Sequence, residues 1–225
     1  MYQFATLLLL LLGLCSCLGS EAEPQSSPRQ LSPAAPPDSM TLPVQADRSF
    51  VPGTRFGAIR PDMSILDIER VYGAEQLVTT EVALGEGMTA PGYRLFPDQR
   101  DEALLLLGED KRPATVTVRS PEARWYSPKP AFLMVRMRLA ELVASNGCPF
   151  TFSGFNWDYG GTVTDWRGGR LTGTRVRLSY APESLTTEGL PDRLQGDQPI
   201  PSDAEELQPL DIYVAEFTVG LRPNP

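Results

Sequence analysis

One short segment, TFSGFNWDYGGTVTDW, contains the residues best suited to chemistry: Trp157, Asp158, Asp165 and Trp166. If Gly160-Gly161 formed a two-residue turn between paired strands, the two Asp residues would be diagonal neighbours, roughly 7–8 Å apart at Cα. Two carboxyl groups about 5–9.5 Å apart are what a glycosidase requires, and the two Trp residues would share the opposite face as a platform for sugars. One hypothesis is therefore a glycan-binding, peptidoglycan-binding or weakly hydrolytic surface made of these four residues.

The same segment also fits the core of a small β-sheet, and this second interpretation stays open beside the first. Phe150 and Phe152 alternate to one side, and a bulge at Ser153-Gly154 would shift the alternation by one residue. Burial of each large aromatic side chain contributes roughly 1.5–3 kcal/mol. In this case Asp158 faces solvent, and the aromatic stripe continues through Phe155, Trp157 and Tyr159, with Trp166 nearby.

The composition excludes most catalytic chemistry. The chain has no histidine, which removes Ser-His and Cys-His nucleophilic catalysis and the usual zinc and iron sites. Gly85-Glu86-Gly87 has neither the Lys nor the strand–loop–helix context of a phosphate-binding loop. We therefore expect no enzyme, no metal and no cofactor.

The N-terminus is typical of an exported protein. The apolar run from Phe4 to Leu14 is shorter than the about 20 residues that span a bilayer. It matches the apolar region of a secretory signal, so residues 1–16 are interpreted as a signal peptide.

The four residues Leu14-Cys15-Ser16-Cys17 resemble the lipobox of bacterial lipoproteins. The resemblance implies cleavage before Cys17, acylation of its sulfur with a fatty acid such as palmitate, and acylation of the new amino terminus. The residue after the cysteine is Leu18 rather than Asp, which in that family implies export to the outer membrane, facing the periplasm. The alternative is an ordinary signal peptide cleaved near Ser20 or Ala22. If Cys17 is lipidated, Cys148 is the only thiol left, and the mature chain has no disulfide.

Residues 17–49 are predicted to be a disordered linker that follows the lipidated cysteine. They are rich in Ser and Ala, and their prolines stand at 24, 28, 33, 36, 37 and 43. A Pro-rich chain extends by about 3.1 Å per residue, so this linker could hold the folded part tens of Å from the membrane.

The charge is uneven along the chain. The net charge is −8, and the predicted loop 181–210 with its flank holds most of the excess. Against Arg193 alone stand Glu183, Glu188, Asp192, Asp197, Asp203, Glu205, Glu206 and Asp211. No basic surface is evident, so no nucleic-acid partner is expected. A solvated loop is one interpretation, and binding of a divalent cation or a basic peptide is the other.

An internal repeat with an offset of 74 residues relates residues 59–74 to residues 133–148. Both copies predict a short helix that ends at a glycine, and Asp62 or Ser64 could cap the first, with Asp67 closing a capping box with Ser64. The equivalent pairs are Ile59 and Leu133, Met63 and Met137, Ile65 and Leu139, Asp67 and Glu141, Ile68 and Leu142, and Gly73 and Gly147.

After each helix the apolar period changes from 3.6 to 2, which predicts strands. These are expected over 78–84, 93–96, 102–107, 114–118, 150–159, 162–166, 170–180 and 211–221. The predicted fold class is α+β, with two tandem modules, 50–128 and 129–225, each a short helix packed on an antiparallel β-meander.

The first helix carries Met63-Ser64-x-x-Asp67-Ile68-x-x-x-Tyr72-Gly73. This pattern resembles the helix signature of SmpA/OmlA-type outer-membrane lipoproteins and of tandem β-lactamase-inhibitor-like repeats, with Asp62 where those modules have Gly. The copy from Met137 to Gly147 is a looser match. The resemblance implies a periplasmic scaffold that binds other proteins rather than an enzyme. Asn146-Gly147-x-Pro-Phe with Gly-Phe-x-Trp-Asp-Tyr-Gly-Gly also resembles a group of bacterial envelope proteins to which no activity is assigned.

Overall fold

The structure is a computed structural model, and it describes residues 46–185 and 189–222. The predicted signal peptide, Cys17 and the linker up to residue 45 lie outside the described residues. Within them the fold is mixed but mostly β, with two α-helices and eleven strands in three antiparallel sheets. The α+β class is thus confirmed at this level.

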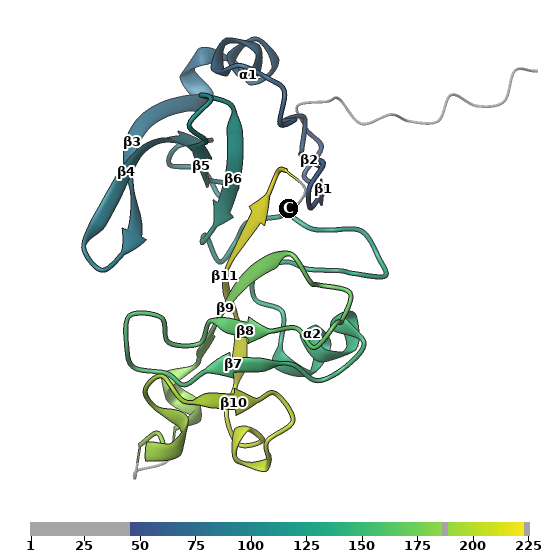
Figure 1. Ribbon diagram of the computed structural model, residues 1–225, viewed down its shortest axis with the longest axis vertical. Helices are drawn as coiled ribbons and strands as arrows, with labels where there is room; N and C mark the ends of the chain where they lie inside the picture. The colour runs from purple at the N-terminus through teal and green to yellow at the C-terminus, as the bar shows by residue number, and fades with distance from the viewer. Residues whose placement is uncertain (1–45, 186–188, 223–225) are drawn as a thin grey trace, which may run out of the picture. The chain divides into compact units, whose positions relative to one another are not determined.

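The largest sheet has six strands in the order β3-β4-β5-β6-β11-β9. Its first four strands form a meander that follows helix α1, and Figure 1 shows β11 between β6 and β9. Strands β9 and β11, from the second half of the chain, therefore extend the sheet of the first half. The bounds are β3 Leu77–Gly85, β4 Met88–Leu95, β5 Ala103–Leu107, β6 Pro113–Val118, β9 Thr174–Tyr180 and β11 Ile212–Gly220.

Alternation of side chains gives this sheet one apolar face. Phe217 of β11 pairs with Val118 of β6 on one side and with Val176 of β9 on the other. These side chains point the same way as Leu105 and Val116, and all five are fully buried. The opposite face carries the intervening polar residues, as expected for an antiparallel sheet with one face on the core.

The two smaller sheets are β1-β2, made of Phe50–Val51 and Arg55–Phe56, and β10-β7-β8, made of Pro199–Pro201, Thr151–Ser153 and Val163–Asp165. The predicted loop 181–210 thus contains a strand that the sequence did not indicate. Ile200 is buried between two prolines and pairs with Phe152. Proline is tolerated here because β10 is an edge strand.

The two helices lie where the predicted repeat places them. Helix α1 spans Ile65–Tyr72 and helix α2 spans Leu139–Asn146, so both ends differ by 74 residues. In α1 the Ser64 hydroxyl accepts from the backbone N–H of Asp67, and the Asp67 carboxylate accepts from the backbone N–H of Ser64. This capping box confirms Ser64, rather than Asp62, as the cap.

In α2 the equivalent carboxylate, Glu141, accepts from the backbone N–H of Arg138 at 2.8 Å, but Arg138 has no acceptor to complete the box. Ile68 and Leu142, the equivalent inward-facing residues, are both fully buried. A glycine with positive φ follows each helix, and only Gly147 has the left-handed helical conformation.

The folded part begins before Phe50, where the sequence placed its boundary. The backbone N–H of Phe50 donates to Tyr126 O, and the N–H of Tyr126 donates to Arg48 O. Arg48 also forms an ion pair at 2.8 Å with Asp101, whose backbone carbonyl accepts from the indole N–H of the buried Trp125. Residues 47–49 are therefore an integral part of the fold rather than of the linker.

Candidate functional site

The predicted hairpin register between residues 156 and 166 is wrong. Asp165 pairs with Thr151 and Val163 with Phe152, instead of Asp165 with Asn156. The physical reason is Gly154, where an added Cβ would lie 2.7 Å from the carbonyl oxygen of Gly196. After β7 the chain turns away from its partner strand β8 and runs beside residues 194–196. Gly160-Gly161 therefore ends a longer loop instead of forming a two-residue turn.

The four residues of the glycan hypothesis are therefore not brought together on one face. Trp166 is buried at 7% exposure, its ring lies 5.0 Å from that of Phe150, and its indole N–H donates to Thr174 O. Trp157 is half-buried and donates to Gly154 O, while Asp158 is exposed. Asp165 is exposed at the end of β8, where its carboxylate accepts from the backbone N–H of Arg167.

The core interpretation holds for part of the segment only. Phe150, Phe152 and Phe155 are buried and contact one another in sequence, at ring distances of 6.5 and 5.6 Å. Trp157 and Tyr159 instead leave the stripe and pack edge-to-face against each other in the loop.

The strongest candidate for a binding surface is the outer face of α2, which the sequence reasoning did not select. Ala140 and Ala144 lie one turn apart on this face, and both are exposed. Leu139 and Val143 flank them and are half-buried. Glu141 is the only charged residue in the helix, so most of the solvent-facing surface of α2 is apolar.

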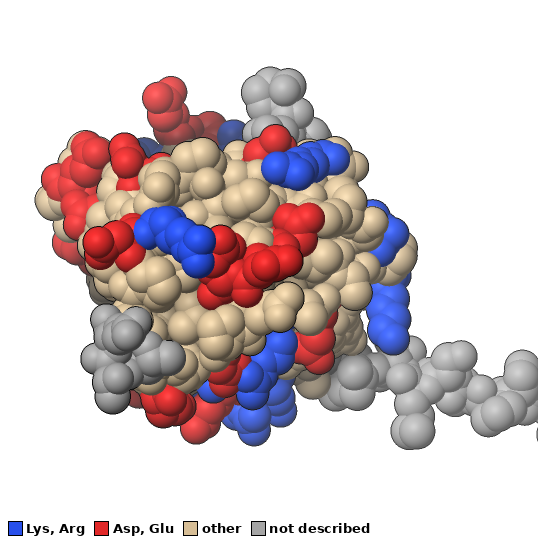
Figure 2. All heavy atoms as spheres, turned by 90° about the horizontal axis from the view of Figure 1, so that it is seen from below, with Lys and Arg blue, Asp and Glu red and all other residues tan. Residues whose placement is uncertain are grey.

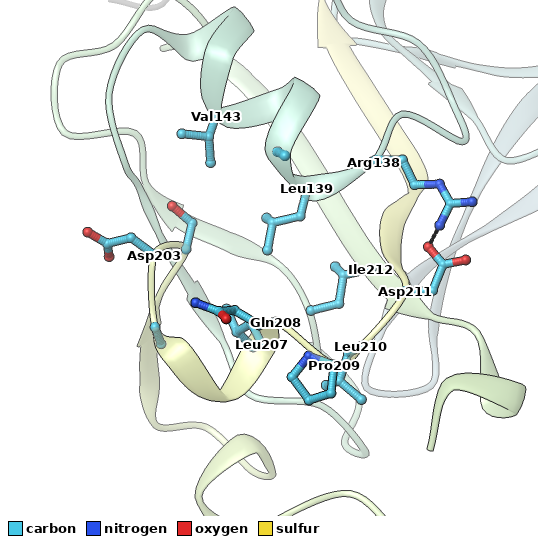
Figure 3. A pocket seen from close by; sticks show the side chains of 13 residues that line it. Arg138, Leu139, Val143, Asp203, Leu207, Gln208, Pro209, Leu210, Asp211 and Ile212 are labelled. Carbon is cyan, nitrogen blue, oxygen red and sulfur yellow. Dashed lines mark ion pairs between the residues drawn. The ribbon is translucent and has the colours of Figure 1, made fainter. Parts of the chain in front are cut away.

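Two hollows border this face of α2. The first, of about 650 Å³, lies between the helix and residues 202–212. Figure 3 shows Leu139 and Val143 on one side of it and Leu207 and Ile212 on the other, with the ion pair of Arg138 and Asp211 at one end.

The second hollow, of about 730 Å³, lies on the other side of the helix, between α2 and residues 129–137. Phe132, Met134 and Met137 supply most of its apolar wall, and Ala144 lines it from the helix. Methionine side chains adapt to differently shaped partners. Together with Ala140 and Ala144, the two hollows form what we term the α2 surface.

The predicted repeat supplies an internal reference for this surface. In α1 the residues equivalent to Val143 and Ala144 are Glu69 and Arg70, and their exposure classes match position by position. These two positions are therefore charged in the first copy and apolar in the second, whereas the position of Ala140 is apolar in both, with Leu66 in α1. The sequence contained this signal, because aligning the copies places Arg70 opposite Ala144.

Charges of both signs line the α2 surface, with Glu141 beside Lys129 and Arg136 in the second hollow and Arg138 beside Asp211 in the first. Among the described residues neither Lys129 nor Arg136, which line the second hollow, has a carboxylate partner. The opposite rim belongs to the acid-rich segment 189–211, and Figure 2, viewed from the β10 end, shows acidic side chains gathered on this face. Arg193, the one basic residue of this segment, forms an ion pair with Glu206 at 2.6 Å.

Within residues 46–185 and 189–222, no three His, Cys, Asp or Glu side chains are grouped so that they could hold a metal ion. In the same part of the chain, no helix is both long and apolar enough to span a bilayer. Cys148 is a half-buried free thiol.

Comparisons with protein families, with curated proteins and with solved structures gave no significant match.

Proposed function

We propose that this chain is a non-enzymatic lipoprotein, anchored to the outer membrane through Cys17 and facing the periplasm, that acts as a scaffold for another protein. The observation that carries the proposal is the α2 surface, which is apolar at Val143 and Ala144, where α1 has Glu69 and Arg70. At Ala140 both copies are apolar, because the equivalent residue of α1 is the exposed Leu66. A helix that is apolar on most sides is normally covered, and an exposed apolar patch bordered by polar residues is typical of an interaction site.

The chemistry of the surface defines the partner. Two hollows on either side of a helix accept apolar side chains from a segment lying across Ala140 and Ala144, whose small side chains allow close approach. Carboxylates of the same segment would pair with Lys129 and Arg136, which have no carboxylate partner among the described residues. We therefore expect an amphipathic partner segment with acidic residues at one end.

The repeat is the second part of the proposal. We interpret the chain as two copies of one unit, a short helix followed by antiparallel strands, that share the six-stranded sheet. The identical helix lengths, the equivalent carboxylates Asp67 and Glu141 and the equivalent buried residues Ile68 and Leu142 support this interpretation. In this interpretation the second copy carries the binding face, where Val143 and Ala144 replace the charged Glu69 and Arg70 of the first.

Site-specific photo-crosslinking in intact cell envelopes tests the proposal. A photo-reactive amino acid at Ala144 of the full-length chain should give a discrete adduct with one other protein, because this position lies within the α2 surface. The matched control is the same amino acid at Arg70, the equivalent exposed position of α1, which should give no adduct.

Equal adducts from both positions, or none from Ala144, would refute the proposed surface. An adduct with the mass of two copies of this chain would show that the α2 surface mediates self-association instead of binding another protein. Anchoring is tested separately: Cys17→Ala should move the chain from the membrane to the soluble fraction, and an unchanged distribution would contradict lipidation.

A further inference from the structure

The second face of the six-stranded sheet forms a groove that the scaffold function does not use. Its floor consists of side chains from β5, β6, β9 and β11, and its volume is about 710 Å³. One wall is the end of the β3–β4 hairpin and the other is the loop 158–162. The walls approach each other where a Cβ added to Gly85 would lie 3.0 Å from the hydroxyl of Tyr159.

Three arginines lie in the groove, in a chain of net charge −8. Arg175 and Arg177 are adjacent on one face of β9, and Arg119 extends from the end of β6. Against these three stand Glu216, which forms an ion pair with Arg119, and the exposed Asp158. A third carboxylate, that of Glu86, lies at the edge of the groove, where it hydrogen-bonds Tyr159. The groove therefore carries charges of both signs, and its arginines lie on the floor.

Two of these arginines are already held in place. Arg119 pairs with Glu216, and the Nε–H of Arg177 donates to Gly160 O at 3.0 Å. Arg175 is exposed and has no hydrogen-bond or ion-pair partner among the described residues. A guanidinium presents a planar set of donors that matches a carboxylate or a phosphate, so Arg175 is available for an anionic ligand.

The remainder of the groove offers hydroxyl groups, the ring of Tyr159 and aliphatic side chains from β3 and β5. Thr115, Thr117, Thr162 and Thr218 line it, and the hydroxyls of Thr117 and Thr218 are 2.8 Å apart. A hydroxyl both donates and accepts hydrogen bonds, as do the hydroxyls of a sugar. Tyr159 forms part of one wall. A smaller hollow of about 470 Å³, lined by Trp157 and Tyr180, adjoins the groove beyond Arg119 and Arg177.

A peptide strand fits this site less well than a saccharide. Peptides that extend a sheet bind to the unpaired backbone groups of an edge strand. Most of the floor belongs to β5, β6 and β11, which are interior strands and already paired on both sides. Strand β9 is an edge strand, but near Arg177 it is bridged by Thr162, and the backbone N–H of Leu178 donates to Gly161 O. The groove thus offers side-chain hydroxyls, guanidinium groups and rings rather than free backbone groups.

We propose that the groove between the β3–β4 hairpin and the loop 158–162 binds an acidic saccharide, with Arg175 holding its anionic group. The experiment is calorimetric titration of the full-length chain with a galacturonic acid trisaccharide, a neutral galactose trisaccharide, inorganic phosphate and a glutamate-rich peptide. The acidic trisaccharide should bind and the neutral one should not. Added salt should weaken binding, because Arg175 is exposed.

Arg175→Ala should weaken binding of the acidic trisaccharide by about tenfold, the loss expected for one charge-assisted hydrogen bond. The thermal unfolding midpoint should not change, because this side chain has no partner among the described residues. Arg70→Ala, on the outer face of α1, is the matched control and should leave binding unchanged.

Three results would overturn the proposal: no binding of the acidic trisaccharide by the folded chain, equal binding to Arg175→Ala, or equal binding of the neutral trisaccharide. If phosphate or the acidic peptide bound as tightly as the acidic trisaccharide, and with the same dependence on Arg175, the groove would be a general anion site instead of a saccharide site.

Discussion

Replacing Asp101 by asparagine should produce a loss of stability that depends on pH. The carboxylate is only 2% exposed. It accepts hydrogen bonds from the backbone N–H of Arg124 at 3.0 Å, from the Arg124 guanidinium and from the Nε–H of Arg48 at 2.8 Å. It therefore joins two segments that are distant in the sequence to the loop before β5.

The pKa of Asp101 provides the magnitude. Burial raises it, but the hydrogen bonds from Arg124 and Arg48 outweigh this and leave the pKa at about 2, against an ordinary value of 3.8. The difference corresponds to about 2 kcal/mol of folding free energy. Because the folded pKa is lower than the unfolded one, this stabilisation is fully present above the unfolded value and is lost as the pH falls through the folded one.

We therefore expect Asp101→Asn to lower the free energy of unfolding by about 2 kcal/mol at pH 7. The difference from the unmodified chain should shrink steadily between about pH 4 and pH 2. Urea denaturation of both chains, followed by tryptophan fluorescence at a series of pH values, measures it. A difference that is absent at pH 7, or that stays constant down to pH 2, would refute the electrostatic account.

Asp110 provides the control for this experiment, because its carboxylate is exposed and pairs with Arg222 at 2.6 Å. An exposed ion pair contributes about 0–1 kcal/mol. Asp110→Asn should therefore change stability much less than Asp101→Asn.

Four further substitutions test local parts of the fold by urea denaturation. Ser64→Ala removes the cap of α1 and should cost about 1 kcal/mol. Tyr72→Phe leaves the backbone N–H of Ala58 without its acceptor, now 2.8 Å away, and should cost about 1–3 kcal/mol. Trp166→Ala should cost about 3–5 kcal/mol because the ring lies in the core, whereas Trp157→Ala, in a half-buried loop position, should cost clearly less.

Each of these results has a contrary outcome. A neutral Ser64→Ala or Tyr72→Phe would mean that the corresponding hydrogen bond is replaced by water at no cost. If Trp157→Ala destabilised the chain as much as Trp166→Ala, the loop 154–161 would belong to the core after all.

The sequence predicted the elements whose periodicity is strong and local. Both helices, the capping box at Ser64 and the strands of the β3–β6 meander follow from the spacing of apolar residues and from capping chemistry. Strand β10 could not be predicted, because its prolines argue against a strand unless the edge position is known. The register near Gly154 was missed because it is set by the distant backbone of Gly196.

The candidate sites were likewise predictable only where a local pattern defines them. The alternation of β9 places Arg175 and Arg177 on one face, but only the fold places Arg119 beside them. The apolar outer face of α2 is visible in the repeat, yet its two hollows are formed partly by residues 129–137 and 202–212, whose positions no local pattern specifies.

The central claim is that a partner protein binds across α2. The most direct test introduces charged residues on the α2 surface. Ala140→Glu combined with Ala144→Arg places a Glu–Arg pair at i, i+4 on exposed positions, an arrangement that favours the helix. With a photo-reactive amino acid at Gln208, in the wall of the first hollow, we predict that the partner adduct seen in the otherwise unmodified chain disappears in the double variant, while the unfolding midpoint is preserved. An adduct of undiminished yield from the folded double variant would show that the partner does not bind across α2.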